Sequence, residues 1–265
     1  MIEEGAGIIG ISISIMKCLI VADLHYSLKQ FDWVNLAAEK FDLVVIAGDL
    51  LDISSTVEIE TQILVVLKYL RRIQPKARLL VSSGNHDGNA RNAAGESVAS
   101  WLDKARDLGA LVDGDTLEEE GILFTICPWW DGPETQAGVA MQFERDAARR
   151  NGKWIWIYHA PPDASKTSWT GKVHFGDSEL PGWIEKYRPD MVFSGHVHQA
   201  PFRNGGSWVE KVGSTVVFNA GRQLGSPPAF IAVDTDADTA CWFSQMANER
   251  IHLDRPEEKT DLAAG

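Results

Sequence analysis

Short apolar runs separated by segments of helical periodicity occupy the first two-thirds of the chain. Six of the runs are four or five residues long and predict strands buried in a sheet, at residues 18–22, 43–47, 78–82, 122–126, 154–158 and 191–194. Between them, apolar residues recur every three or four positions and predict helices at residues 32–40, 57–73, 96–108, 135–150 and 178–187. This alternation is typical of a sheet covered by helices and predicts an α/β fold.

Beyond residue 200 the pattern changes to short apolar runs joined by turns that contain Gly, Pro and Asp. They predict mostly antiparallel strands at residues 207–212, 215–219, 229–234 and 239–244. No linker or repeat divides the chain, so residues 16–254 are predicted to form one domain. Residues 1–15 are predicted to lead into the first strand, with residues 1–10 as a dispensable extension, and the polar residues 255–265 to form a frayed tail.

The composition is that of an ordinary globular protein. Its 265 residues, 45% of them hydrophobic, are enough to bury a core without disulfides or structural zinc. A net charge of −12 argues against a basic groove for long nucleic acids and against binding to an anionic membrane surface. No apolar run of about 20 residues is present to cross a membrane. The three cysteines are widely spaced, which favours a reducing compartment, and we expect the cytoplasm.

Polar clusters directly follow five of the predicted strands. They contain five of the seven histidines and are Asp23-Leu24-His25, Gly48-Asp49-Leu50-Leu51-Asp52, Gly84-Asn85-His86-Asp87, His159 and Gly195-His196-Val197-His198. Because ligands bind beyond the carboxyl ends of the strands in α/β sheets, we expect these loops to converge on one crevice. Asp, His and Asn side chains suit divalent ions such as Mn, Fe, Zn or Ni, and seven candidate ligands are enough for two ions that share a carboxylate.

Each cluster also has a purely structural explanation. A single Asp-x-His or Gly-Asp sequence is more often a turn or a helix cap than a site. Histidines in turns and on surfaces are common, and His159 alone would be interpreted as structural. What favours a metal site is the conjunction of five clusters in equivalent positions at strand ends.

Together, these motifs resemble those of the calcineurin-like metallophosphoesterase superfamily over residues 18 to about 221. The resemblance implies two mixed β-sheets packed as a sandwich and flanked by α-helices, with a dinuclear metal centre between the sheets. It implies that one ion is held by Asp23, His25, Asp49 and His198, and the other by Asp49, Asn85, His159 and His196. Asp49 is the implied bridge, His86 the implied catalytic residue beside the scissile phosphate, and Asp52 the carboxylate that orients His86.

The expected activity is divalent-metal-dependent hydrolysis of phosphate esters, by in-line attack of a hydroxide that bridges the two ions. The acidic composition favours small phosphodiesters or nucleotides as substrates and leaves a nuclease as a less favoured possibility. A phosphomonoesterase or a nucleotide pyrophosphatase would use the same ligands, and a non-catalytic scaffold that binds proteins is a candidate from another class. A scaffold does not need the complete ligand set that this chain has, which favours an enzyme.

Two further segments are candidates for substrate selection. Trp129 and Trp130 lie in a loop bounded by Pro and Gly. Either a nucleobase or an aryl group stacks there, or one tryptophan fills the core and the other lines the surface. Arg222 follows the predicted strand at residues 215–219 and either binds a phosphate oxygen or forms a surface ion pair. Trp169 and His174 are candidates for the rim of the site. The sequence leaves all these roles open.

Overall fold

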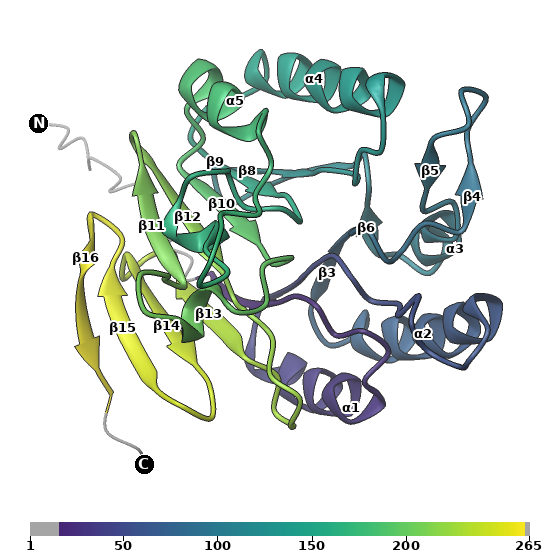
Figure 1. The fold of residues 1–265 in the computed structure, drawn as a ribbon, viewed down its shortest axis with the longest axis horizontal. Coiled ribbons are helices and arrows are strands. Elements are labelled where there is room, and N and C mark those ends of the chain that lie inside the picture. Colours follow the sequence, from purple (N-terminus) through teal and green to yellow (C-terminus); the bar gives the residue numbers. More distant parts are fainter. Residues whose placement is uncertain (1–15, 263–265) are drawn as a thin grey trace, which may run out of the picture.

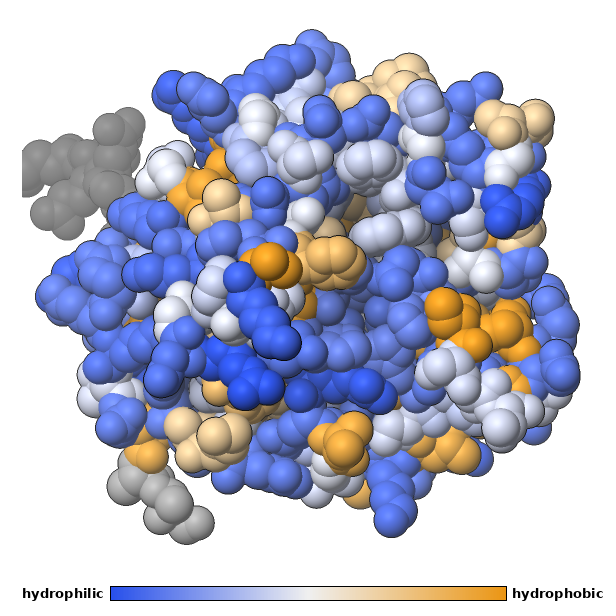
Figure 2. All heavy atoms as spheres, viewed as in Figure 1, coloured by the Kyte–Doolittle hydropathy of each residue, from blue (hydrophilic) through white to orange (hydrophobic). Residues whose placement is uncertain are grey.

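The computed structural model describes residues 16–262, which form two large β-sheets packed face to face with helices on their outer faces (Figure 1). The predicted α/β sandwich of two mixed sheets is therefore confirmed. The predicted extension at residues 1–10 and the lead-in up to residue 15 lie outside the described residues. On the face shown in Figure 2, hydrophobic residues lie in small separate groups among hydrophilic ones.

The first sheet has eight strands, and its middle and one edge are parallel. The parallel strands are β1 (Lys17–Val21), β2 (Leu43–Ala47), β3 (Arg78–Ser82) and β6 (Leu111–Val112). The antiparallel strands continue from β1 and are β13 (Phe230–Asp234), β14 (Thr239–Phe243), β15 (Asn248–His252) and β16 (Arg255–Asp261). The sheet order β16-β15-β14-β13-β1-β2-β3-β6 places the long antiparallel ribbon on one side of the parallel strands.

The second sheet has six strands, with parallel strands in the middle and one antiparallel strand at each edge. The parallel strands are β8 (Ile122–Ile126), β9 (Lys153–Ile157), β10 (Met191–Ser194) and β12 (Thr215–Asn219). The edges are β7 (Thr116–Glu119) and β11 (Val209–Val212). A separate hairpin consists of β4 (Ala90–Arg91) and β5 (Ser97–Val98).

The helices cover the outer faces of the two sheets. Those on the first sheet are α1 (Leu28–Ala37), α2 (Ile59–Ile73) and α3 (Leu102–Asp107), and those on the second are α4 (Pro133–Ala147) and α5 (Leu180–Tyr187). Because successive side chains of a strand point to opposite faces, β1 serves two cores. Cys18 and Ile20 pack between the sheets, whereas Leu19 and Val21 pack under the helices.

Two predictions about secondary structure are wrong. The helix predicted at residues 96–108 is confined to α3, since the first residues of that segment enter the β4–β5 hairpin, where the Ser97 N–H donates to the Asp131 carboxylate. The tail predicted to fray is largely β16, which pairs with β15 and buries Pro256. An ion pair of 3.0 Å between Lys259 and Glu249 joins these two strands, and it is a long-range contact that the local sequence pattern does not reveal.

Candidate metal centre

All the predicted ligands lie at the carboxyl ends of parallel strands. In the first sheet, β1 leads to Asp23 and His25, β2 to Asp49, and β3 to Asn85. In the second sheet, β9 leads to His159, and β10 to His196 and His198. The seven residues therefore come from five loops on two different sheets, and the packing of the sheets brings the loops together.

The loops turn sharply at the ligands themselves. Asp23, His25, Asp49 and His196 all have a positive φ, of 55°, 40°, 55° and 64° respectively. Asp, Asn and His are the side chains other than Gly that tolerate this conformation best, although it carries strain. Hydrogen bonds between loops hold the turns, since the Asp23 N–H donates to the Gly48 carbonyl at 3.1 Å and the His25 N–H to the Asp49 carbonyl at 2.9 Å. Strain of this kind is concentrated at functional sites in proteins.

Two glycines of the motifs allow the loops to approach so closely. A Cβ atom on Gly84 would lie 2.7 Å from Nε2 of His159, and one on Gly195 would lie 2.6 Å from Oδ2 of Asp23. Any larger residue at either position would displace a ligand.

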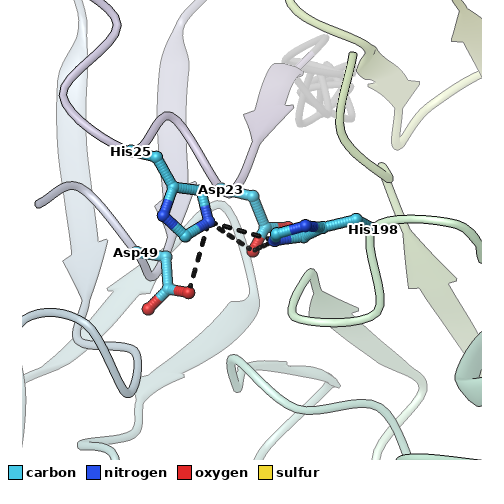
Figure 3. A group of neighbouring side chains, drawn as sticks. All are labelled: Asp23, His25, Asp49 and His198. Atoms are coloured by element: carbon cyan, nitrogen blue, oxygen red, sulfur yellow. Dashed lines mark hydrogen bonds and ion pairs between the residues drawn. The ribbon is translucent and has the colours of Figure 1, made fainter. Parts of the chain in front are cut away.

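Four side chains form the first half of the candidate centre, where their ligand atoms lie within 4.8 Å of one another (Figure 3). Nε2 of His25 lies 3.0 Å from Nε2 of His198 and 3.8 Å from Oδ1 of Asp23. Nε2 of His198 lies 3.3 Å from the same Asp23 oxygen. Oδ2 of Asp49, at 3.6 Å from Nε2 of His25, completes the group.

Asp49 also belongs to the second half. Its Oδ2 atom lies 3.3 Å from Nε2 of His159, so one carboxylate oxygen faces a histidine of each half. Oδ1 of Asn85 lies 3.3 Å from Nε2 of His159 and 2.9 Å from Nδ1 of His196. The structure thus brings all seven predicted ligands together in the two groups expected, with Asp49 between them.

The charges and protonation states of these groups suit cations. Within residues 16–262, no lysine or arginine nitrogen lies within 4.0 Å of the buried Asp23 and Asp49 carboxylates, which face only histidines. Burial lowers the pKa values of His25 and His196 to about 4 despite the nearby aspartates, so both rings are neutral and present lone pairs. Buried carboxylates beside neutral imidazoles and an amide oxygen form a suitable donor set for divalent ions.

His159 differs from His25 and His196. Burial disfavours its charged form, but the neighbouring Asp49 carboxylate outweighs burial and raises the pKa of His159 to about 9. Its Nδ1 atom contacts the Ala47 carbonyl at 2.7 Å, which fixes the ring with Nε2 towards Asp49. A ligand histidine is commonly oriented in this way by a backbone carbonyl.

The sequence of the chain matches the family model described as calcineurin-like phosphoesterase over residues 16–200. The chain belongs to this family. Its members are metal-dependent phosphoric ester hydrolases, and the cluster of Asp and His residues fits their dinuclear metal site. No curated protein matches the chain.

Solved structures share the fold of this calcineurin-like phosphoesterase at low sequence identity. TT1561 of Thermus thermophilus is 13% identical, with a TM-score of 0.60 over 94% of this chain and 98% of that one. The purple acid phosphatase PPD1 from yellow lupin (Lupinus luteus) seeds is also 13% identical, with a TM-score of 0.54 over 94% of this chain and 53% of that one. Within the described residues, no helix is long and apolar enough to span a bilayer.

His86 lies at the mouth of the phosphoesterase centre, partly exposed, with its ring 4.5 Å from that of His25. The predicted partner Asp52 is 3.8 Å away, between its Oδ1 and the Nδ1 of His86. That oxygen accepts hydrogen bonds from the N–H and hydroxyl of Ser54, at 2.9 and 2.6 Å. The Ile53 N–H donates to Nδ1 of His86 at 3.3 Å, so the backbone orients the ring together with Asp52.

Asp87 is a positioning residue to which the sequence motif alone assigned no role. One of its oxygens accepts hydrogen bonds from the N–H groups of Leu50 and Leu51, and the other from that of Gly84. It therefore ties the loop that carries Asp49 to the loop that carries Asn85. Burial, followed by the charge of Asp49, raises the pKa of Asp87 to about 8. Its place in the Gly-Asn-His-Asp motif was the available signal.

The candidate aromatic residues divide between the core and the rim. Trp130 is structural, because its Nε1 donates to Tyr158 and Asp177 at 2.7 Å each. The ring of Trp129 lies 5.5 Å from that of His196 and therefore borders the centre. Phe175, which was not predicted from the sequence, stacks on His196 at 5.1 Å and is 59% exposed.

Trp169 and His174 pack against each other at 4.9 Å, and His174 is tied by a 3.0 Å hydrogen bond to Ser168. Arg222 has no carboxylate within 4.0 Å in the described part of the chain, so the surface ion pair considered for it is not formed. It lies instead in a pocket that also includes His198.

Proposed function

We propose that this calcineurin-like phosphoesterase hydrolyses phosphodiesters of small molecules or nucleotides, using two divalent ions. The observation that carries the proposal is the position of the Asp49 oxygen between His25 and His159, which supports a shared ligand between two neighbouring ions. We further propose Mn, Fe, Zn or Ni as the ions, because the donors are imidazole nitrogens and oxygens without a thiolate. A cytoplasmic location belongs to the proposal and is supported by three free cysteines, Cys18, Cys127 and Cys241.

The proposed ligands also determine the net charge of the centre. Two divalent ions, when bound, stabilise the charge that builds up on phosphoryl oxygens and lower the pKa of water at the site. The carboxylates of Asp23 and Asp49 contribute −2 against +4 from two dications, which leaves about +2 formally. An anionic ester is therefore attracted to the centre although the whole chain carries a net charge of −12.

His86 is the proposed proton donor. It is partly exposed at the mouth of the centre, where it can reach a departing ester oxygen. Nδ1 of its ring faces the Asp52 carboxylate, so Nε2 of an imidazolium held by Asp52 is the atom that would give a proton to the departing oxygen.

The proposal is tested by hydrolysis of bis(4-nitrophenyl) phosphate with added Mn²⁺, Fe²⁺, Zn²⁺ or Ni²⁺, before and after treatment with a chelator. We expect turnover that the chelator abolishes and that exceeds turnover of 4-nitrophenyl phosphate, with cyclic nucleotides and single-stranded DNA as further comparisons. Faster cleavage of the monoester would favour a phosphomonoesterase. Absence of turnover with every ion, despite metal detected by elemental analysis, would favour the protein-binding scaffold.

A further inference from the structure

A pocket of about 380 Å³ opens directly beside His198. Its walls come from three segments that are distant in the sequence. One follows β10 and includes Phe202 and Arg203, one follows β12 and includes Arg222 and Leu224, and the turn between β14 and β15 contributes Met246. Its volume is within the range of pockets that bind small ligands. Since His198 is shared with the candidate metal centre, a phosphate at the centre would have one ester arm beside this pocket.

The charge of the pocket is positive. Arg203 and Arg222 line it, no carboxylate does, and neither arginine has an Asp or Glu oxygen within 4.0 Å among residues 16–262. Two arginines without a carboxylate, facing one pocket, form a site for an anion that arrives with a ligand.

The rest of the wall is apolar and exposed. Leu224 is 87% and Met246 is 75% exposed, and both line the pocket. Phe202 lies deeper, with its ring 5.4 Å from that of the buried Trp242. The pocket therefore combines a cationic part with an apolar part, which suits a ligand that has an apolar chain and an anionic end.

Hydrogen bonds hold the wall that carries Arg222 and Leu224 in place. The buried side chain of Gln30, in α1, donates to the carbonyl groups of Gln223 and Gly225 at 2.7 Å each. The side chain of Gln223 in turn accepts a hydrogen bond from the N–H of Gln245, next to Met246. These contacts join the second and third segments of the pocket, so the site is formed before a ligand binds.

Gly221 determines the path of the segment that carries Arg222. Its φ is +70°, and a Cβ atom there would lie 2.6 Å from Cγ of Pro201 and 3.0 Å from Cε2 of Phe202. The segment therefore passes directly against the segment that follows β10 and carries Phe202. The Arg222 N–H donates to the His198 carbonyl at 3.1 Å. This places Arg222 between the metal centre and the apolar part of the pocket.

We infer that this pocket binds the ester arm of the substrate that stays on phosphorus, and that it selects arms in which an apolar chain ends in a second anionic group. The inference rests on the proposed function, since it assigns the substrate class of that same site. Arg222 and Arg203 bind the second anion, whereas Leu224 and Met246 cover the chain that connects it to the phosphate.

The test uses 4-nitrophenyl phosphodiesters that share one leaving group and differ in the second arm, which is ethyl, hexyl or 5-carboxypentyl. The readout is the ratio of kcat/KM for each longer arm to that for the ethyl arm. Arg222→Gln is expected to lower the 5-carboxypentyl ratio about tenfold, because it removes a charge-assisted hydrogen bond. Leu224→Ser is expected to lower both the hexyl and 5-carboxypentyl ratios about fivefold.

Arg203→Gln is a second variant that tests binding of the same anion. It is expected to lower the 5-carboxypentyl ratio, as Arg222→Gln does. The matched control is Arg71→Gln, at an exposed position on α2 outside the pocket, which is expected to leave every ratio unchanged. Equal ratios in the wild type, Arg222→Gln and Arg203→Gln would overturn the inference while leaving the proposed function intact.

A binding measurement separates the pocket from catalysis. Binding of 6-phosphonohexanoate to chelator-treated protein is followed by calorimetry, and Arg222→Gln is expected to weaken it about tenfold. If no ester is hydrolysed but this weakening is found, the proposed function fails and the pocket is supported. If esters are hydrolysed and the probe binds both proteins equally, the pocket assignment is wrong.

Discussion

Asp49 connects the two halves of the candidate centre through a single carboxylate oxygen. That oxygen lies 3.6 Å from Nε2 of His25 and 3.3 Å from Nε2 of His159, and the other oxygen accepts the His86 N–H at 2.9 Å. The carboxylate is buried, and burial would raise its pKa, but His159 and the hydrogen bonds outweigh this and lower the pKa. Asp49 therefore remains an anion at neutral pH.

Replacing Asp49 by Asn keeps the shape of the side chain and removes its charge. We expect Asp49→Asn to bind fewer than two ions per chain and to lose about a hundredfold or more in kcat, since the shared ligand is lost from both halves. Elemental analysis and hydrolysis of an aryl phosphodiester check this. Asp236→Asn, in an exposed turn, is the control. Full metal content in Asp49→Asn would contradict the assignment of the bridge.

His86 is expected to act on the substrate and not on the ions. His86→Ala should lower kcat by about a hundredfold or more, the usual effect of losing a general acid, while metal content stays at the wild-type level. The measurement pairs steady-state kinetics with elemental analysis of the same samples, and the exposed His252→Ala serves as control. Loss of metal together with activity would show that His86 is a ligand.

Single side chains also fix whole elements in position around the centre. Helix α4 follows the loop that carries Trp129, and its first N–H groups are capped by a distant residue. The Glu96 carboxylate accepts hydrogen bonds from the N–H groups of Glu134 and Thr135, at 2.8 and 2.7 Å. An anion at a helix N-terminus interacts favourably with the helix dipole. Glu96 thus anchors α4 to the β4–β5 hairpin.

The hydrogen bonds between Glu96 and α4 predict how the thermal stability of the protein depends on pH. Burial would raise the pKa of Glu96, but the hydrogen bonds from α4 outweigh it and lower that pKa. A lowered pKa in the folded state means that the stabilisation is complete above the unfolded value of about 4.5 and disappears as the pH falls through the folded value. Glu96→Gln should therefore have a lower melting temperature than the wild type at pH 7, and the difference should shrink towards pH 4.

Thermal unfolding of both proteins between pH 4 and pH 8 is the measurement. Glu118→Gln, at an exposed position on β7, is the control and should match the wild type throughout. A difference between Glu96→Gln and the wild type that does not vary with pH would show that the carboxylate charge is not what stabilises α4.

At the scale of the whole molecule, the two sheets share one core and one centre. The first sheet supplies Asp23, His25, Asp49 and Asn85, and the second supplies His159, His196 and His198. The distance between these two sets depends on how the sheets pack. Phe193, fully buried in β10 between the sheets, lies three residues before His196.

Phe193→Ala is expected to lower the free energy of unfolding by about 3–5 kcal/mol, because a large side chain is removed from a closely packed core. It should also weaken metal binding, since β10 carries the loop of His196 and His198. Urea denaturation and metal titration test both effects. Leu36→Ala, at a residue of α1 that is 70% exposed, should change neither. Unchanged stability in Phe193→Ala would mean that the two sheets are not held together by this core.

The sequence by itself determined the strand-end motifs and the core strands. Strands β2, β3, β8, β10 and β12 have the predicted bounds, because buried parallel strands are continuous apolar runs that are shorter than helices and are bounded by turn residues. The sequence also predicted the types of ligand, because Asp, His and Asn side chains gathered at strand ends suit divalent ions.

Only the tertiary structure decided how these pieces meet. It pairs β15 with the polar β16, caps α4 with Glu96 and joins the loops through Asp87, and each of these contacts links residues whose local sequence carries no signal of its partner. It also decided between roles that the sequence left open, since the partly buried Trp130 is hydrogen-bonded to Tyr158 and Asp177 while Arg222 faces a pocket. The reason is physical. Periodicity reports which face of an element is buried, whereas the distance between two loops depends on the packing of two entire sheets.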